Sequence, residues 1–134
     1  MLKTIFNKDS KELARQMVVV FSQHVNELLK NQDQVVLAIS GGRSVLDIFY
    51  FFGKESPINW QKIQIFMLDE RLVPLDDPVS NFYLAKQSFI NRLVEERKLP
   101  AKNVHPFIYN EREPGEGTAT YDLELTQFGG ECDI

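Results

Sequence analysis

The chain has 134 residues, with 15 Lys and Arg against 19 Asp and Glu, so its formal net charge is -4. A hydrophobic fraction of 43% and a charged fraction of 25% are typical of a globular domain and exclude a chain that is disordered throughout. The acidic balance argues against a nucleic-acid partner, which usually requires a basic surface. The single cysteine, Cys132, excludes an intramolecular disulfide framework, and with two histidines a Cys/His metal site is not expected.

The apolar runs are short. The longest, such as 17–21 and 48–52, contain about five residues, whereas a membrane-spanning helix needs about 20. Residues 1–13 also lack the apolar core that a signal peptide requires. We therefore expect a cytoplasmic protein with no membrane partner.

The first elements alternate between strand and helix. Residues 3–7 are predicted as a short strand, and a helix begins at Asp9, with Glu12 in a capping-box relation. Residues 35–39 are continuously apolar, as in a strand that is buried on both faces. The helix carries an apolar stripe at helical spacing, formed by Leu13, Met17, Phe21, Val25 and Leu28.

The middle of the chain repeats this alternation. Residues 45–52 are predicted as a short helix that ends at Gly53, and residues 63–68 as a second buried strand. The next helix begins at Ser80 or Asn81. Its predicted buried stripe is Phe82, Ala85, Phe89, Ile90 and Leu93.

The last part predicts a strand over 104–108, shortened by Pro106, and a helix that begins at Thr118 or Thr120 and ends at Gly129. Residues 131–134 have the pattern of the first residues of another strand. This alternation predicts an α/β fold with three layers, in which a mostly parallel Rossmann-like sheet carries helices on both faces. We expect residues 1–134 to be the N-terminal part of one such domain, incomplete at the C-terminus.

One candidate binding segment follows the first buried strand. It consists of Ser40, Gly41, Gly42, Arg43 and Ser44. Ligands of such sheets bind beyond the carboxyl ends of strands, and glycines together with the free N–H groups of a helix start favour phosphate. The alternative is an ordinary strand-to-helix turn, in which Ser44 caps the helix and Asp47 completes a capping box.

A second candidate segment follows the strand at 63–68 and consists of Asp69, Glu70 and Arg71. Two carboxylates and a guanidinium could supply an acid or base and an anion contact. Because successive side chains of an extended chain alternate, Asp69 and Arg71 should share one side and Glu70 the other. The alternative is a solvated loop with a local ion pair. His105, beside Pro106, is interpreted as structural, and His24 as a partly buried surface residue of the first helix.

Taken together, these segments resemble the 6-phosphogluconolactonase family. That family has a strand followed by S-G-G-[ST]-[ST]-P, then a W, then D-E-R-x-V-P at a strand end, and then S-N at a helix start. The matching residues here are Ser40 to Ser44, Trp60, Asp69 to Pro74, and Ser80 with Asn81. Leu99–Pro100 and Asn103 to Pro106 are also similar to the family's I-P-x-x-N-V-H segment. The ordered set covers essentially the whole chain.

The chain departs from the family pattern at three points. Val45 stands where the family often has Pro, and Leu72 replaces a frequent Trp after D-E-R. Family members are also roughly twice as long. Their G-x-G-x-D-G-H-T-A-S-L-F-P segment, which supplies the histidine thought to activate water, is not among these 134 residues.

The resemblance implies hydrolysis of 6-phosphoglucono-δ-lactone to 6-phosphogluconate in the oxidative pentose phosphate pathway, with no metal and no other cofactor. It implies catalytic roles for Asp69 and Arg71 and a phosphate site at residues 40–44. It also places Glu70, Ser80 and Asn81 in the pocket. The alternatives are a glucosamine-6-phosphate deaminase/isomerase-like enzyme, in which an aromatic residue usually stands at the position of Arg71, and a non-catalytic sugar-phosphate-binding module.

The same resemblance predicts that the 134-residue chain alone is inactive. It also predicts self-association. A strand that has only begun at residues 131–134 would leave one edge of the parallel sheet and part of one face uncovered. We therefore expect a homo-oligomer that forms through this edge.

Overall fold

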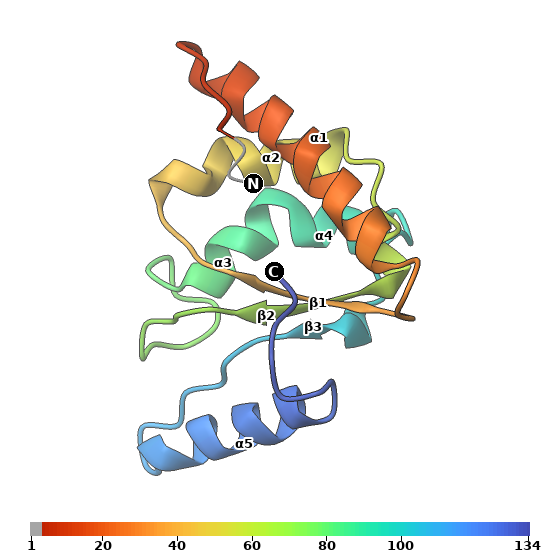
Figure 1. The fold of residues 1–134 in the computed structure, drawn as a ribbon. Helices are drawn as coiled ribbons and strands as arrows, with labels where there is room; N and C mark the ends of the chain where they lie inside the picture. Colours follow the sequence, from red (N-terminus) through yellow and green to blue (C-terminus); the bar gives the residue numbers. More distant parts are fainter. Residues whose placement is uncertain (1–3) are drawn as a thin grey trace.

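The computed structural model describes residues 4–134. Three parallel strands form the sheet in the order β1 (Val35–Ile39), β2 (Ile63–Met67) and β3 (Val104–His105). In the register, Val35 lies opposite Ile63, and Ile65 lies opposite Val104. The predicted α/β class is confirmed, because helices cover both faces of this sheet (Figure 1).

One face of the sheet carries α1 (Ser10–Leu28), α2 (Leu46–Lys54) and a helix of three segments. The three segments are α3 (Asn81–Ala85), a π-helical stretch over Lys86–Ile90, and α4 (Asn91–Glu95). The opposite face carries α5 (Pro114–Thr126) alone (Figure 1). Within residues 4–134, no helix is long and apolar enough to cross a lipid bilayer.

The C-terminal residues lie along the outer edge of β1. The N–H of Ile134 donates to the carbonyl oxygen of Val36 at 3.3 Å, and the N–H of Ala38 donates to that of Ile134 at 2.9 Å. This alternating pattern is that of a parallel pair, so residues 133–134 begin a fourth strand, as the sequence predicts. After β3 the chain forms α5 on the opposite face of the sheet and then returns to the edge of β1 that does not pair with β2 (Figure 1). The direction in which strands are added therefore reverses at β1.

The main core lies between the sheet and the helices of the first face. Alternate strand residues point into it, and α2 meets the π-helical stretch at Gly53, where an added Cβ would lie 3.2 Å from the Cβ of Phe89. Aromatic rings fill the centre: Phe49 and Phe89 have centroids 4.9 Å apart, and Phe52 and Trp60 5.5 Å apart. Six aromatic residues are thus committed to this core, namely Phe21, Phe49, Phe52, Trp60, Phe82 and Phe89.

The predicted elements agree with the structure except for the strand predicted at 3–7 and for the ends of several others. The stripe Phe82, Ala85, Phe89, Ile90 and Leu93 is buried as predicted. Asp9 caps α1 by accepting hydrogen bonds from the N–H groups of Lys11 and Glu12. Residues 4–7 form no strand, and Lys3 lies outside the described residues. The helix predicted at Thr118 or Thr120 begins at Pro114, where proline suits the first helical turn.

The stripe predicted for α1 is wrong in its first half. Met17 is exposed and Leu13 half-buried, because the helix turns a neighbouring row toward the core. The buried residues of α1 are Ala14, Val18, Phe21, Ser22 and Val25. Both rows have helical spacing, so periodicity alone could not choose between them.

The α5 face depends on one buried tyrosine. β3 ends at His105, one residue before Pro106, which has no N–H to donate. Beyond this point Tyr121 of α5 replaces the missing strand: its hydroxyl accepts from the N–H of Met67 and donates to the carbonyl oxygen of the same residue. Burial raises the pKa of Tyr121, which keeps this hydroxyl protonated.

Replacing Tyr121 by phenylalanine should therefore destabilise the fold. The Tyr121→Phe variant keeps the ring against Phe66 but leaves the N–H and C=O of Met67 without this partner, which costs about 1–3 kcal/mol. Urea unfolding followed by circular dichroism measures this loss. The matched control is Tyr50→Phe on the exposed side of α2, which should change the free energy of unfolding by less than about 0.5 kcal/mol. Equal effects of the two substitutions would contradict this role for Tyr121.

His105 makes the stability of the same face dependent on pH. Its ring stacks on Phe66 at 4.3 Å, with Nε2 2.8 Å from Oε1 of Gln64 and Nδ1 3.3 Å from Oε2 of Glu124. Burial lowers the pKa of His105, and the Glu124 carboxylate opposes this shift only in part. Below the ordinary pKa of about 6.5 the unfolded chain therefore binds more protons than the folded one.

The free energy of unfolding should accordingly fall as the pH drops from about 6.5 through the lower pKa of folded His105. Urea unfolding at a series of pH values between about 7.5 and 5 tests this. A His105→Gln variant has no titrating ring and should show a flatter pH dependence across the same range. A variant with the same slope as the unaltered chain would show that other groups cause the loss.

Candidate functional site

The two candidate segments lie at the same edge of the sheet, because the carboxyl ends of parallel strands meet there. The loop at 40–44 follows β1, and the segment 69–71 follows β2. A hydrogen bond of 2.8 Å from the N–H of Leu68 to the carbonyl oxygen of Ile39 extends the pairing to the point where both loops begin. The loop after β1 also stands where the strand order reverses, which is the usual ligand position in open α/β sheets.

Both glycines of this loop are required by geometry. Gly42 has φ +101° and ψ 169°, a conformation that is essentially restricted to glycine. Gly41 lies against Asn81, and a Cβ added to Gly41 would lie 2.0 Å from Oδ1 of that amide. The loop therefore packs directly on the start of α3, and the 3₁₀ turn Arg43–Val45 leads from it into α2.

The capping-box alternative for this loop is not what the structure shows. Ser44 is exposed, and neither the 3₁₀ turn nor α2 has a hydrogen bond from a capping side chain. Asp47 turns toward α1, where its Oδ2 lies 3.4 Å from the hydroxyl of Ser10. The negative charge of Asp47 therefore faces away from the loop.

Glu70 binds the start of α3. Its carboxylate accepts hydrogen bonds from the N–H groups of Asn81 at 2.7 Å and Phe82 at 2.8 Å, and from the hydroxyl of Ser80 at 3.0 Å. A carboxylate is favourable at this position because the first N–H groups of a helix have no partner within it. Glu70 thus anchors the loop that joins β2 to α3.

A hollow of about 390 Å³ lies between the two loops and α3. Five of the predicted residues line it, namely Gly42, Arg43, Arg71, Ser80 and Asn81. The sequence analysis did not identify its apolar walls, which are Leu46, Pro78, Val79 and Leu84. Leu46 and Val79 are 39% and 60% exposed, and no spacing signal distinguishes them from ordinary surface residues.

The remaining predicted residues lie outside the lining of this hollow. Ser40 lines an apolar groove between β1 and the helices α1 and α2, and Gly41 packs against the side chain of Asn81. Ser44 is exposed beyond the loop, and Glu70 faces α3 because its carboxylate is bound there. Asp69 is exposed and hydrogen-bonded to Asn81. The predicted pocket thus contains half of the residues proposed for it, and the others surround it.

Two guanidinium groups give the hollow its charge. Arg43 and Arg71 are both exposed, and within residues 4–134 neither side chain forms a hydrogen bond or an ion pair. The local ion pair considered for Arg71 is therefore not formed. Each guanidinium keeps a planar set of donors that matches phosphate or carboxylate oxygens. This arrangement suits a small anionic ligand, although the chain as a whole carries a net charge of -4.

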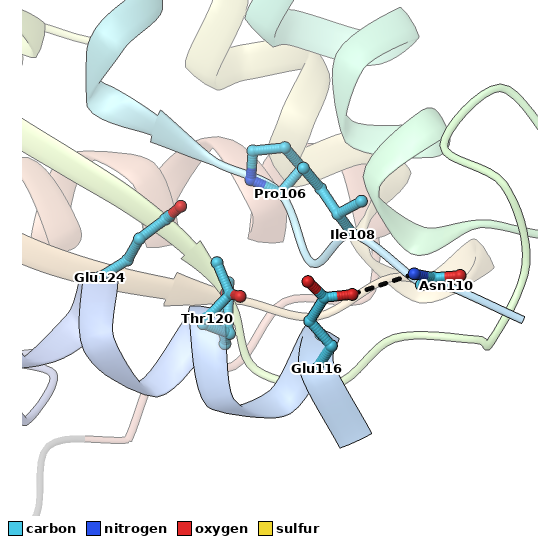
Figure 2. Close-up of a pocket in the computed structure, with 8 residues that line it drawn as sticks. Pro106, Ile108, Asn110, Glu116, Thr120 and Glu124 are labelled. Atoms are coloured by element: carbon cyan, nitrogen blue, oxygen red, sulfur yellow. Dashed lines mark hydrogen bonds between the residues drawn. The ribbon is translucent and has the colours of Figure 1, made fainter. Parts of the chain in front are cut away.

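A second hollow, of about 200 Å³, lies between α5 and the segment before it (Figure 2). Glu116 and Glu124 line it, and the amide of Asn110 donates to Glu116 at 3.0 Å. No lysine or arginine is among its described lining residues, so its charge opposes an anionic ligand. Across residues 4–134, no three His, Cys, Asp or Glu side chains form a group that could hold a metal ion.

The sequence that forms the first hollow is similar to the sequences of known proteins. The 6-phosphogluconolactonase of Thermotoga maritima is 33% identical over 115 residues, which are 78% of this chain and 50% of that protein. The enzyme of the same name from Synechocystis is 26% identical over 116 residues, covering 87% of this chain and 46% of that protein. The chain spans about half the length of the curated relatives it matches.

Solved structures agree with the sequence matches. The crystal structure of the Thermotoga maritima 6-phosphogluconolactonase superposes with a TM-score of 0.76 at 26% identity, covering 91% of this chain and 52% of that one. The family model described as glucosamine-6-phosphate isomerases/6-phosphogluconolactonase matches residues 8–134. The chain therefore belongs to the glucosamine-6-phosphate isomerase/6-phosphogluconolactonase family.

Proposed function

We propose that this protein takes part in the hydrolysis of 6-phosphoglucono-δ-lactone to 6-phosphogluconate, and that residues 4–134 supply the site for the substrate phosphate. The observation that carries the proposal is the hollow that Arg43 and Arg71 line, where neither guanidinium group is paired with a carboxylate of residues 4–134. The names of the relatives support the choice of substrate. A role in the oxidative pentose phosphate pathway and a cytoplasmic location belong to the same proposal.

The chemistry divides into binding and reaction. Phosphate bound at the loop after β1 supplies orientation, since it lies far from the lactone carbon that reacts. Hydroxide formed from water attacks the lactone carbonyl carbon, and negative charge develops on the carbonyl oxygen. Collapse of this intermediate breaks the bond between that carbon and the ring oxygen, which takes up a proton and becomes a hydroxyl group of 6-phosphogluconate. Arg71, the guanidinium of the D-E-R segment, is suited to stabilise such an anion, and the carboxylate of Asp69 can accept hydrogen bonds or a proton at the edge of the hollow.

Neither histidine of the chain is placed to activate this water. Both ring nitrogens of His105 face Gln64 and Glu124 on the α5 side of the sheet. His24 is exposed on α1. The family segment that contains D-G-H is not among the 134 residues. We therefore propose that these residues bind the phosphate and do not by themselves catalyse the reaction.

Two alternatives make different predictions. A glucosamine-6-phosphate deaminase/isomerase-like enzyme would use the same phosphate loop, but the resemblance places an aromatic residue at the position of Arg71. A non-catalytic sugar-phosphate-binding module accounts for the binding hollow without a reaction. Assays of the full-length gene product with the lactone and with glucosamine 6-phosphate separate these functions, because only the lactonase produces 6-phosphogluconate.

Arginine removal tests the binding site directly. Arg43→Ala and Arg71→Ala should each weaken the binding of 6-phosphogluconate about tenfold, because each removes charge-assisted hydrogen bonds to the anion. Isothermal titration calorimetry with the 134-residue chain measures the dissociation constants. Lys102→Ala is the matched control: it removes one positive charge from the exposed turn Ala101–Asn103, at the amino end of β3. Its affinity should be unchanged, and equal losses in all three variants would indicate a nonspecific charge effect.

The reaction is tested separately. The 134-residue chain should hydrolyse the lactone no faster than a protein-free control, because loss of a general base alone typically lowers the rate by about 10²–10⁴-fold. Spontaneous hydrolysis of the lactone makes that control essential, and release of acid at constant pH gives the rate. Saturable turnover that disappears in an Asp69→Asn variant would show that the active site is complete within these residues.

A further inference from the structure

We propose that Asn81, which lines the hollow, is a positioning residue that orients the carboxylate of Asp69, so that Asp69 recognises the sugar part of the ligand and not its phosphate. The inference rests on the proposed function, because it assigns a second contact to the same bound sugar phosphate. The side chain of Asn81 is only 1% exposed, so contact with a ligand cannot by itself account for a polar group at this position.

The amide of Asn81 holds Asp69 at two points. Its Nδ2 donates to the backbone carbonyl oxygen of Asp69 at 3.0 Å and to the carboxylate Oδ2 of the same residue at 3.2 Å. A side chain held through both its backbone and its carboxylate loses most of its rotational freedom before the ligand binds. No other hydrogen bond engages the carboxylate of Asp69 within residues 4–134, so Oδ1 is available to accept one from a ligand hydroxyl.

The rest of the amide is fixed by its surroundings. Oδ1 of Asn81 occupies the space that a Cβ of Gly41 would fill, only 2.0 Å from that ideal position. The backbone N–H of Asn81 donates to Glu70 at 2.7 Å, which fixes the start of α3 relative to the strand end. Asn81 therefore connects the loop after β1 with the loop after β2, and its position sets that of Asp69.

The chemistry of the hollow explains why such a residue is needed. Two guanidinium groups bind any small dianion of suitable size, so they cannot by themselves distinguish a sugar phosphate from inorganic phosphate. The Asp69 carboxylate, which is hydrogen-bonded to the lining residue Asn81, would repel the phosphate but accept hydrogen bonds from the hydroxyl groups of the sugar. Discrimination then depends on the fixed direction of the Asp69 carboxylate.

The test compares two ligands of the same chain by isothermal titration calorimetry, inorganic phosphate and 6-phosphogluconate. The readout is the ratio of their dissociation constants, which reports recognition of the sugar part alone. Asn81→Ala should reduce this preference for 6-phosphogluconate by about three- to tenfold, as expected for the net contribution of one hydrogen bond. The affinity for phosphate alone should change by less than about twofold.

A double-variant cycle identifies the path of the effect. Asp69→Ala changes an exposed side chain, should leave the fold intact, and should reduce the ratio as Asn81→Ala does. If Asn81 acts through Asp69, the double variant should have the same ratio as either single variant, because the second change removes nothing more. Gly41→Ala should imitate Asn81→Ala, since its new Cβ displaces the amide.

Three results would overturn the inference. Asn81→Ala could weaken both ligands equally, which would mean that the residue only supports the fold. Asp69→Ala could leave the ratio unchanged, a result that stands even if Asn81→Ala does not fold. The effects of the two substitutions on the ratio could also multiply. Failure of the proposed function is distinct, because Arg43→Ala would then leave the affinity for inorganic phosphate unchanged.

Discussion

The contact between Gly41 and Asn81 is the constraint on which the rest of the site depends. The loops after β1 and β2 can share one hollow only if the start of α3 approaches the first loop closely, and the space for a Cβ at Gly41 is already filled by the amide. The same amide binds Asp69. One small residue and one buried polar residue thus hold the loop after β1, the start of α3 and the loop after β2 together.

The placement of nearby carboxylates makes the hollow favourable for anions in an acidic chain. Two carboxylates have partners elsewhere: Glu70 binds the start of α3, and Asp47 faces α1. The charge of Asp47 is therefore directed away from the loop, and that of Glu70 is balanced locally by N–H donors. A net charge of -4 averages over these differences and cannot reveal them.

The sequence predicts the layers of this fold well because apolar runs and helical spacing report burial directly. The stripe from Phe82 to Leu93 shows this, since all five of its residues are buried. Spacing does not decide between two rows with the same helical period, as in α1, and it does not show where a tertiary contact determines the outcome. Tyr121 is such a case: nothing in its local sequence shows that its hydroxyl bridges two backbone groups of Met67.

The candidate site, like the fold, could be predicted from the sequence only in part. The motifs identify the segments, because glycines, arginines and a helix-capping serine are recognisable in order along the chain. They do not separate residues that line the hollow from residues that build it. Glu70 and Arg71 are adjacent in sequence, yet one anchors α3 and the other lines the hollow, since successive side chains of an extended segment point in opposite directions.

The reversal of strand order at β1 explains why the glycine loop follows this strand and not β2. On one side of β1 the chain continues through α2 toward β2, and on the other side residues 133–134 arrive from α5 on the opposite face (Figure 1). Connections that leave a sheet toward opposite faces open a crevice at the strand end between them. The backbone N–H groups after β1 are thus accessible to a ligand, whereas the loop after β2 must pack against α3. Gly42 supplies the backbone conformation that the loop after β1 adopts at this end of the sheet.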